Sequence, residues 1–441
     1  MEVSTPETAI AWRKRYERFH PDKPPDNRNP AERDRDRILY TSALRRLAGV
    51  TQVVSADEGH VFHNRLTHSL EVAQVARRMA ERLSRDQLDA ARALELDPDV
   101  AEAAALAHDL GHPPFGHVAE TELDRLMEKE GLTEGFEGNA QSFRVVNKLA
   151  LHFPGHPGLN LTRATLNGML KYPCLHLKGE DPKKWGAYQT EEPEFRWARQ
   201  EFESADLRRS VEAEVMDWAD DVTYAVHDAG DFYRAGLTPL DRLTLDESER
   251  KRFFDGMERR YAMQGKPLPY PRAELESVFD SLIQYFPIHE RYRGTREHRC
   301  LLRAYTAQLI RDYIYAVELS LGTRPSGRFV SIWEKAVKEV TVWKELTWYY
   351  VILNPSLATQ QDGQRRVISG LFEIFGAAAK DHRYGLFPDS VREELEAVAG
   401  DTKAELRTVA DMIAGMAERQ AVDMYLRLTG VSLGSALACL V

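Results

Sequence analysis

The chain has 441 residues, of which 43% are hydrophobic and 29% charged, a composition typical of a soluble globular protein. Its formal net charge of −10 argues against a nucleic-acid-binding surface spread over the whole protein, although a local basic pocket is compatible with it. No stretch approaches about 18 consecutive apolar residues and the N-terminus has no apolar leader, so we expect a cytoplasmic protein without membrane contact. The three cysteines, Cys174, Cys300 and Cys439, lie far apart and predict a reducing compartment without a disulfide framework.

The chain divides into three regions. Residues 1–35 are rich in charge and proline and are expected to form an N-terminal arm over the surface. Residues 36–235 carry helical periodicity, and we interpret them as the core of the protein. The pattern of residues 236–441 predicts a further helical region. Because no strand series, heptad run or internal repeat appears, the sequence predicts an all-α fold.

The first strongly periodic segment covers residues 66–83. His68, Val72, Val75 and Met79 recur there at the spacing of one helix face. His68 is therefore expected on a buried face, where a lone imidazole needs a partner.

The next predicted helix starts with Asp97 as N-cap and Pro98 as its first residue. Its inward stripe ends at His108, and Gly111 is positioned to end the helix. Asp109 follows His108 directly, so the pair can approach one ion from two directions.

A tight loop follows this pair, because Gly111, Pro113, Pro114 and Gly116 restrict the chain there. The loop holds His117 at a fixed offset from the pair. Glu120 lies three residues later, on the same face if the chain re-enters a helix. A carboxylate beside an imidazole raises the imidazole's pKa and orients it, so we interpret His117 and Glu120 as an acid/base dyad. The alternative is a polar helix N-terminus in which Glu120 serves the helix dipole.

Glycine and proline interrupt every periodic run over residues 152–200, which we interpret as an irregular substrate lid. Helical periodicity then returns in five segments: residues 205–235, 297–320, 329–355, 364–380 and 389–430. In the first of these, Asp220, Tyr224 and Asp228 share one face. Asp221 rivals Asp220 as a metal ligand, and only the face shared with Tyr224 favours Asp220.

Two imidazoles and two carboxylates, from His68, His108, Asp109 and Asp220, make a mixed nitrogen and oxygen donor set. Such a set suits a divalent ion of intermediate hardness and is typical of metal-assisted hydrolysis. Two anionic ligands leave coordination positions open for water and a substrate oxygen, as a catalytic site requires.

The sequence resembles the HD-domain superfamily, and specifically the deoxynucleoside triphosphate triphosphohydrolases of the dGTPase family. The resemblance runs from about residue 36 to about residue 430. It rests on the His…His-Asp…Asp signature and on longer runs: Ser42-Ala-Leu-Arg-Arg-Leu-Ala-Gly, His63-Asn-Arg-Leu-Thr-His-Ser-Leu-Glu-Val-Ala-Gln, His108 to Glu120, Gly138-Asn-Ala-Gln-Ser-Phe-Arg-Val-Val, Lys171-Tyr-Pro, Ala219-Asp-Asp-Val-Thr-Tyr and Ile413-Ala-Gly-Met.

The resemblance implies a helical HD-domain fold and hydrolysis of deoxynucleoside triphosphates (dNTPs), dGTP or several of them, to deoxynucleoside and tripolyphosphate. It implies that His68, His108, Asp109 and Asp220 bind a divalent metal ion. Mg²⁺ or Mn²⁺ is favoured, with Fe²⁺, Co²⁺ and Ni²⁺ as alternatives. His117 and Glu120 are implied to be catalytic. The residues assigned to the substrate are Arg46, Arg65, His112, Lys171, Tyr172, Lys184, Tyr224 and Asp228.

Residues 236–441 are expected to complete the site and to supply oligomer contacts, because the resemblance implies a homo-oligomer, a hexamer. An activator dNTP and single-stranded DNA are further expected partners. Two alternative functions stay open. One is another HD phosphohydrolase, a 5′-nucleotidase or a cyclic-nucleotide phosphodiesterase. The other is a weakly active module that binds dNTPs or single-stranded DNA.

Overall fold

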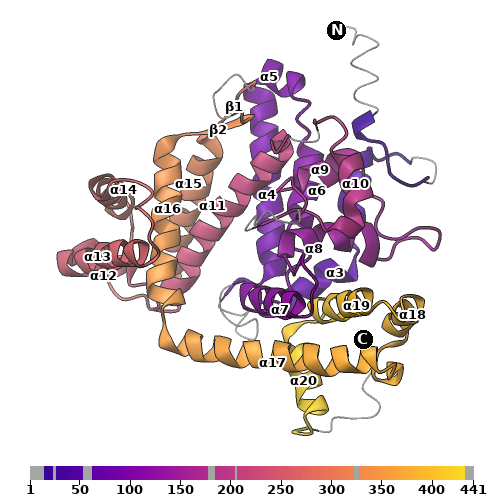
Figure 1. The fold of residues 1–441 in the computed structure, drawn as a ribbon. Coiled ribbons are helices and arrows are strands. Elements are labelled where there is room, and N and C mark those ends of the chain that lie inside the picture. Colours follow the sequence, from indigo (N-terminus) through magenta and orange to yellow (C-terminus); the bar gives the residue numbers. More distant parts are fainter. Residues whose placement is uncertain are drawn as a thin grey trace.

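The computed structural model describes residues 14–22, 26–52, 62–176, 184–203, 206–321 and 327–432. Helices make up most of this part of the chain, as Figure 1 shows. The one sheet within the described residues pairs β1 (Val317–Leu319) antiparallel to β2 (Val330–Ile332), with Glu318 opposite Ser331. The predicted all-α fold is therefore confirmed.

The N-terminal half contains ten labelled α-helices among its described residues: α2 (Pro30–Leu39), α3 (Ser42–Arg46), α4 (Arg65–Asp86), α5 (Leu88–Ala93), α6 (Pro98–Ala107), α7 (His117–Lys129), α8 (Gly138–Arg144), α9 (Arg163–Gly168), α10 (Glu192–Ala198) and α11 (Val211–Arg234). Short turns of other helix types also occur in this half: η1 (Leu47–Gly49), η3 (Val145–Leu149) and η4 (Gln189–Glu191).

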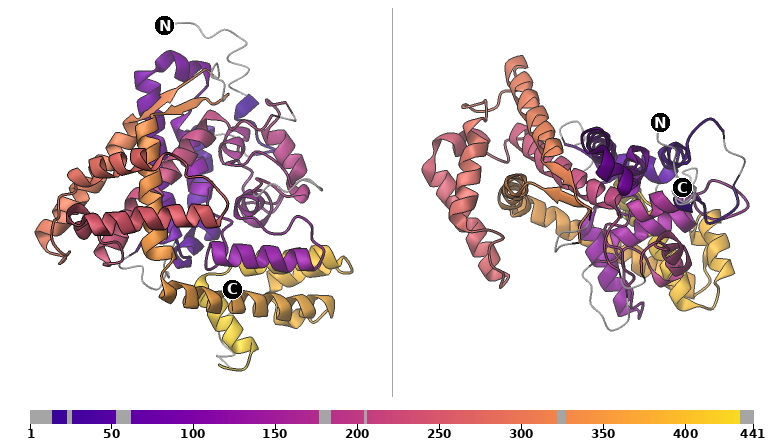
Figure 2. Two further views of the ribbon diagram at one scale, coloured as in Figure 1. Left: turned by 60° about the vertical axis from the view of Figure 1, so that its left-hand side comes forward. Right: turned by 90° about the horizontal axis from the view of Figure 1, so that it is seen from above.

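The C-terminal half continues with helices of very different lengths: α12 (Leu240–Leu245), α13 (Glu247–Met263), α14 (Arg272–Gln284), α15 (Arg296–Tyr315), α16 (Glu334–Thr347), η5 (Trp348–Ile352), α17 (Pro355–Lys380), η6 (Tyr384–Leu386), α18 (Asp389–Ala397), α19 (Thr402–Ala414) and α20 (Glu418–Leu428). Figure 2 shows α13 and α14 projecting from the side of the central bundle.

The central bundle is built on α4, which packs against both α6 and α11. The predicted stripe on α4 is buried: His68 is 3% exposed, and Val72 and Met79 are fully covered. On α6, Ala101, Ala104 and Ala105 are also fully buried. Small alanine side chains let the helix axes approach closely, which brings side chains from all three helices together.

The start of α6 follows the prediction, with Asp97 as N-cap and Pro98 as first residue. Its end does not, because the helix stops at Ala107 and His108 is the C-cap. Gly111 lies in the turn beyond. A Cβ on Gly111 would lie 2.1 Å from the backbone nitrogen of Ser142 in α8, so close packing against α8 requires glycine here. The His108-Asp109 pair therefore leaves the helix and faces the space between helices.

A second core joins α7 to the C-terminal helices. Leu123 and Leu126 of α7 are buried with Phe372 and Phe375 of α17 and Ile413 of α19. In Figure 1, α17 crosses the base of the molecule and lies along α7 and α19. This packing brings the start of α17 beside the central bundle.

Several predicted boundaries are wrong. Helix α2 begins at Pro30, inside the predicted arm 1–35, because Asn29 and Glu32 form a reciprocal capping box. The predicted lid 152–200 contains α9, η4 and α10, and its residues 177–183 lie outside the described part. Helices α12 to α14, whose faces carry many charged residues, were not among the predicted helical segments. Helices α18, α19 and α20 were predicted as one continuous segment, residues 389–430.

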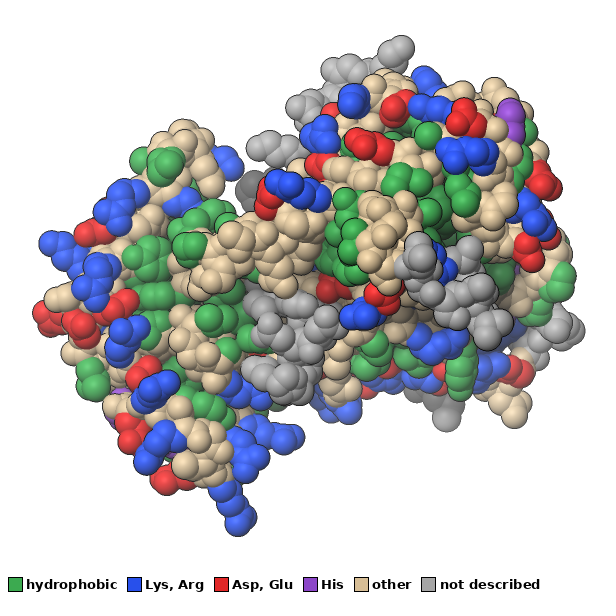
Figure 3. Space-filling model, turned by 90° about the horizontal axis from the view of Figure 1, so that it is seen from below, with side chains coloured by type: hydrophobic (Ala, Val, Ile, Leu, Met, Phe, Trp, Pro, Cys, Tyr) green, Lys and Arg blue, Asp and Glu red, His purple; other side chains and the backbone are tan. Residues whose placement is uncertain are grey.

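The described surface mixes charges of both signs. On the face seen in Figure 3, basic and acidic side chains are interspersed with apolar ones. Among the described residues, no helix is both long and apolar enough to span a bilayer.

Candidate active site

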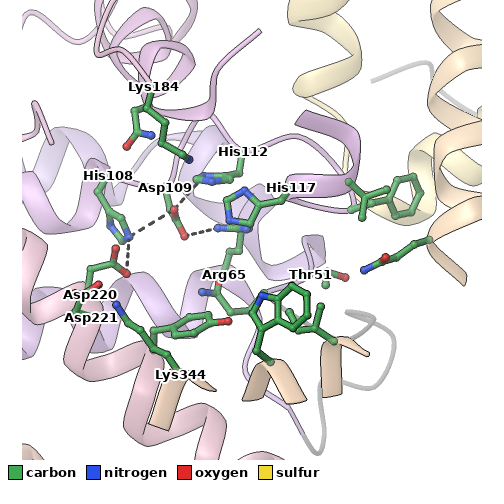
Figure 4. A pocket seen from close by; sticks show the side chains of 18 of the residues that line it. Thr51, Arg65, His108, Asp109, His112, His117, Lys184, Asp220, Asp221 and Lys344 are labelled. Carbon is green, nitrogen blue, oxygen red and sulfur yellow. Dashed lines mark hydrogen bonds and ion pairs between the residues drawn. The ribbon is translucent and has the colours of Figure 1, made fainter. Parts of the chain in front are cut away.

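A cavity of about 420 Å³ opens between the central bundle and the start of α17. It is lined from α4, the turn after α6, α7, α11, α16 and α17, and Figure 4 shows many of these side chains pointing into it. The volume falls in the range of small-molecule sites. Residues far apart in the chain therefore share one chamber.

Three predicted metal ligands lie together, and two of them, His108 and Asp220, line this cavity. His68 comes from α4, His108 caps α6 and Asp220 comes from α11. One ligand atom from each lies within 4.8 Å of the others. Oδ1 of Asp220 is 3.0 Å from Nε2 of His68 and 3.7 Å from Nε2 of His108. The group could hold a metal ion.

The ring of His108 is oriented as a metal ligand should be. Its Nδ1 donates a hydrogen bond of 2.6 Å to the carbonyl oxygen of Ala105, which places the free lone pair on Nε2. That Nε2 is buried and makes no hydrogen bond to any described residue. An unsatisfied buried nitrogen facing a carboxylate and a second histidine fits a bound divalent cation.

Asp109 lies beside this group but is also engaged elsewhere. Its Oδ1 is 3.5 Å from Nε2 of His108, while its Oδ2 accepts a 2.8 Å hydrogen bond from Nη1 of Arg65. Burial favours the neutral carboxyl, but the charge of Arg65 outweighs it and holds the pKa of Asp109 well below its usual value. Asp109 is therefore an anion, and the structure places it within reach of an ion held by His108.

The two neighbouring aspartates of α11 face different partners. Asp220 faces the histidines, and its Oδ2 accepts a 2.8 Å hydrogen bond from Nζ of Lys171. Asp221 instead pairs with Lys344 of α16 at 2.6 Å. The choice that helix spacing left open is thus made by geometry, which puts Asp220 among the predicted ligands.

His117 and Glu120 form a hydrogen-bonded pair at the start of α7. Nδ1 of His117 lies 2.6 Å from Oε2 of Glu120, whose Oε1 accepts a 3.0 Å hydrogen bond from the backbone nitrogen of Gly138. Burial opposes ionisation of Glu120, but contacts with His117 and His112 lower its pKa below the ordinary value. A fixed, anionic Glu120 therefore holds the imidazole of His117, whose side chain is 66% exposed.

Local backbone conformation directs this pair into the cavity. Phe115 and Gly116 both have positive φ angles, of 68° and 57°. A non-glycine residue in this region is strained and persists only where surrounding contacts enforce it. The turn reverses the chain so that α7 begins at His117, beside the aspartate and arginine in Figure 4.

His112 occupies the space between the metal ligands and the dyad. Its Nδ1 lies 3.0 Å from Oδ1 of Asp109, and its ring lies edge-on to His117 with centroids 5.2 Å apart. Burial and the nearby charge of Arg65 lower the pKa of His112 to about 4. His112 is therefore neutral near pH 7.

Five of the remaining predicted substrate residues line the cavity: Arg65, Lys171, Tyr172, Lys184 and Tyr224. Nζ of Lys184 lies 3.6 Å from Oε1 of Glu137 and 4.0 Å from Oε1 of Glu120, so it stands near the dyad.

Two predicted substrate residues do not line the cavity. Arg46 donates instead to the carbonyl oxygens of Leu110 and His112, at 2.8 and 2.9 Å, and so supports the turn that carries His108. Asp228 is buried away from the cavity, and burial raises its pKa well above the usual value. Asp228 shares the face of Asp220 and Tyr224 on α11 but lies one helical turn beyond Tyr224, outside the cavity lining.

Part of the lining could not be predicted from the sequence pattern. A further wall of the cavity comes from the C-terminal half: Lys344, Trp348, Ile352, Leu357, Gln360, Gln361 and Gln364. No spacing or composition in this stretch signals a site, because glutamine and tryptophan are common on ordinary helix faces. Only the packing of α16 against α11 and of α17 against α7 places them here.

Comparison with known proteins agrees with this geometry. The HD domain model matches residues 65–225, which include His68, His108, Asp109 and Asp220, and the phosphohydrolase-associated domain model matches residues 330–427.

Similar proteins extend over nearly the whole chain. A deoxyguanosinetriphosphate triphosphohydrolase-like protein of Streptomyces coelicolor is 38% identical, with 93% of this chain and 95% of that protein covered. Proteins of the same description from Corynebacterium diphtheriae and Wolinella succinogenes are each 34% identical, over 92% and 93% of this chain and 94% and 98% of theirs. Ligand geometry, both domain matches and these relatives together assign the chain to the HD-domain phosphohydrolases, in the deoxyguanosinetriphosphate triphosphohydrolase-like family.

Proposed function

We propose that this protein hydrolyses dNTPs, with dGTP the first candidate, to deoxynucleoside and tripolyphosphate in a reaction that depends on Mg²⁺ or Mn²⁺. The observation that carries the proposal is the pairing of two features in one cavity. The donor group of His68, His108 and Asp220 lies at one end, and the His117–Glu120 dyad opens into the same space. The substrate class follows the description of the relatives as deoxyguanosinetriphosphate triphosphohydrolase-like proteins.

The chain's own residues would supply proton transfer and orientation. With Nδ1 of His117 held by Glu120, its Nε2 is the atom free to exchange a proton with the 5′-oxygen or with the attacking water. Neutral His112 beside it adds a hydrogen-bonding group without adding charge. A divalent ion held by His68, His108, Asp109 and Asp220 would polarise the α-phosphoryl group and orient a water molecule.

Four basic side chains line the cavity and would meet the triphosphate: Arg65, Lys171, Lys184 and Lys344. A triphosphate carries about four negative charges, and guanidinium and ammonium groups are its usual partners in proteins. Burial opposes the charge on Lys171, yet Asp220 and Asp217 raise its pKa well above the usual value, so the ammonium stays protonated. The acidic protein thus concentrates positive charge at this one place.

The other end of the cavity suits a nucleoside. Tyr224 lies one helical turn from Asp220 on α11, where a ring packed under the sugar would leave no room for a 2′-hydroxyl. Trp348 offers a stacking surface, and Gln360, Gln361 and Gln364 offer amide groups for hydrogen bonds to a base. We propose that these side chains bind and recognise the nucleoside.

The oligomer, the activator dNTP and single-stranded DNA stay predictions. We propose a homo-hexamer, which light scattering after size-exclusion chromatography would test. Adding a second dNTP or a single-stranded oligonucleotide to the assay would reveal activation.

The decisive experiment incubates each dNTP with Mg²⁺ or Mn²⁺ and separates the phosphate products by anion-exchange chromatography. Tripolyphosphate in equal amount with deoxynucleoside is the expected result. Parallel incubations contain a nucleoside 5′-monophosphate or a cyclic nucleotide. Release of orthophosphate from the monophosphate, or opening of the cyclic nucleotide, with no tripolyphosphate from any dNTP would instead identify one of the alternative phosphohydrolases. A His117→Ala variant controls for contaminating phosphatases.

A further inference from the structure

A second cluster of potential metal ligands lies on the same two helices as the first. His63 stands just before α4, Glu71 lies on α4, and His227 lies on α11. One ligand atom from each is within 4.8 Å of the other two. Along α11, His227 comes seven residues after Asp220, about 10 Å along the axis, so the two clusters are separate.

The distances inside the cluster are short. Oε2 of Glu71 lies 2.5 Å from Nδ1 of His227 and 3.3 Å from Nε2 of His63. The two imidazole rings are stacked nearly parallel, with centroids 4.9 Å apart. One carboxylate oxygen is therefore held between two imidazole nitrogens.

Asp231 orients His63 from behind. Its Oδ2 lies 2.6 Å from Nδ1 of His63 and accepts a 2.8 Å hydrogen bond from the backbone nitrogen of the same residue. A histidine that binds a metal through one ring nitrogen typically donates its other N–H to such a carboxylate, which fixes the tautomer and the ring plane. Nε2 of His63 is thereby presented toward Glu71 and His227.

Two ligand atoms of the cluster face each other closely. Nδ1 of His227 and Oε2 of Glu71 are buried and form an ion pair at 2.5 Å without the geometry of a hydrogen bond. Both atoms are also ones through which a metal ion could be bound. Ligand atoms around an ion with bonds of about 2.0–2.2 Å lie about 3 Å apart, so a small rotation of either side chain suffices.

We propose that His63, Glu71 and His227 form a second metal site, selective for a Zn²⁺-class transition ion and distinct from the site in the HD cavity. Two imidazoles with one carboxylate suit Zn²⁺ or Co²⁺, whereas Mg²⁺ and Ca²⁺ prefer all-oxygen sets. The cluster opens into a cavity of about 620 Å³ in which water can complete the coordination. Binding there ties the entry to α4 directly to α11.

A proton is the rival occupant of this site. Burial disfavours charge on His63, but contacts with Asp231 and Glu71 outweigh it and raise its pKa to about 10. A purely proton-bridged network would satisfy His63 without a metal. In that network Nδ1 of His227 pairs with Glu71 at 2.5 Å without hydrogen-bond geometry, whereas a metal ion would bind that nitrogen directly.

The test measures Zn²⁺ and Co²⁺ bound per chain by equilibrium dialysis and elemental analysis of the full-length protein. Glu71→Gln and His227→Gln should each bind one equivalent fewer than the wild type and should lose part of the visible Co²⁺ absorption. Asp220→Asn in the HD cavity should retain the Zn²⁺ bound at the second cluster. His289→Gln, which removes an exposed histidine elsewhere, should match the wild type and serves as the control.

Equal Zn²⁺ stoichiometry in the wild type, Glu71→Gln and His227→Gln would overturn the proposal and leave the proton-bridged network. Circular dichroism checks that each variant is folded. Should either variant unfold, the other decides, and its combination with Asp220→Asn must bind less Co²⁺ than Asp220→Asn alone if the second site exists. The outcome is independent of the dNTP assay, since metal binding is measured without substrate.

Discussion

The two histidine–carboxylate clusters on α4 and α11 differ in depth and in what surrounds them. In the HD cavity, His68 and His108 are 3% and 6% exposed, whereas His63 and Glu71 retain 23% and 37% of their side-chain exposure. The HD cluster shares its cavity with the His117–Glu120 dyad and four basic side chains. The second cluster faces a cavity lined by Arg234, Arg299 and Arg303.

Packing of α4 against α11 therefore does not by itself determine what chemistry a cluster can perform. Each cluster takes one residue from α4, one from α11 and one from a third segment. The third segment of the HD cluster is the turn after α6, which also leads into the dyad. The third segment of the other cluster is the entry to α4, where the carboxylate of Asp231 orients His63, itself a proposed ligand. Reactivity therefore depends on the element that completes each site.

The largest effect is expected from Asp220→Asn. Loss of this anion weakens metal binding, and metal polarisation of a phosphoryl group is worth several kcal/mol. We expect kcat for dGTP to fall by about 10³-fold or more. Steady-state kinetics at saturating Mn²⁺ measures it. Asp221→Asn is the matched control, and it should retain the bound metal because Asp221 pairs with Lys344. Equal losses of metal in both variants would break the distinction between the two aspartates.

A smaller loss is expected from His117→Gln. Removal of a positioned acid/base group lowers kcat by about 10²–10⁴-fold. Metal stoichiometry should stay unchanged, because His117 is bonded to Glu120 rather than to the metal ligands. Single-turnover kinetics measures the rate of hydrolysis, and equilibrium dialysis measures the metal bound per chain. Near-normal kcat would show that the dyad is only a helix N-terminus.

Tyr224→Ala should act on selectivity more than on rate. Opening space under the sugar is expected to reduce the preference for dGTP over GTP by about 10- to 100-fold, the range for one shape contact in a pocket. Competition between the two nucleotides, followed by the kcat/KM ratio, measures it. An unchanged ratio of kcat/KM for dGTP and GTP would contradict a contact between Tyr224 and the sugar.

The smallest effect concerns Glu137, a buried acid near the dyad. Burial and the charge of Glu120 raise its pKa from 4.5 to about 7, in contrast to Glu71 in the second cluster, where contacts with His227 and His63 overcome burial and lower the pKa to about 2. Between pH 4.5 and 7 the unfolded chain releases this proton while the folded protein keeps it. Wild-type stability therefore falls as the pH rises through that window.

Glu137→Gln has no such proton, so its stability relative to the wild type should increase from pH 5 to pH 8, by about 1.4 kcal/mol per pH unit at most. Thermal melts across this range measure the trend. The exposed Glu128→Gln serves as the control for loss of one negative charge. A constant difference across the pH range would contradict the raised pKa.

Much of the local structure could be read from the sequence. The buried stripe of α4, the Asp97 cap of α6 and the His117–Glu120 spacing all follow from the period of one helix. The exit at His108 could not be read, because the helix stops where Gly111 must pack against Ser142, a contact that spans two elements.

The sequence by itself determined which side chains could bind a metal, on which helix face each stands, and the family to which the chain belongs. Only the tertiary structure gave Asp220 and Asp221 their different partners, turned Arg46 to the carbonyl groups of Leu110 and His112, and placed Trp348 and the glutamines of α17 on the cavity wall. The reason is physical: residue spacing fixes directions around one helix axis, whereas the distance between helices is set by side chains that pack from distant parts of the chain.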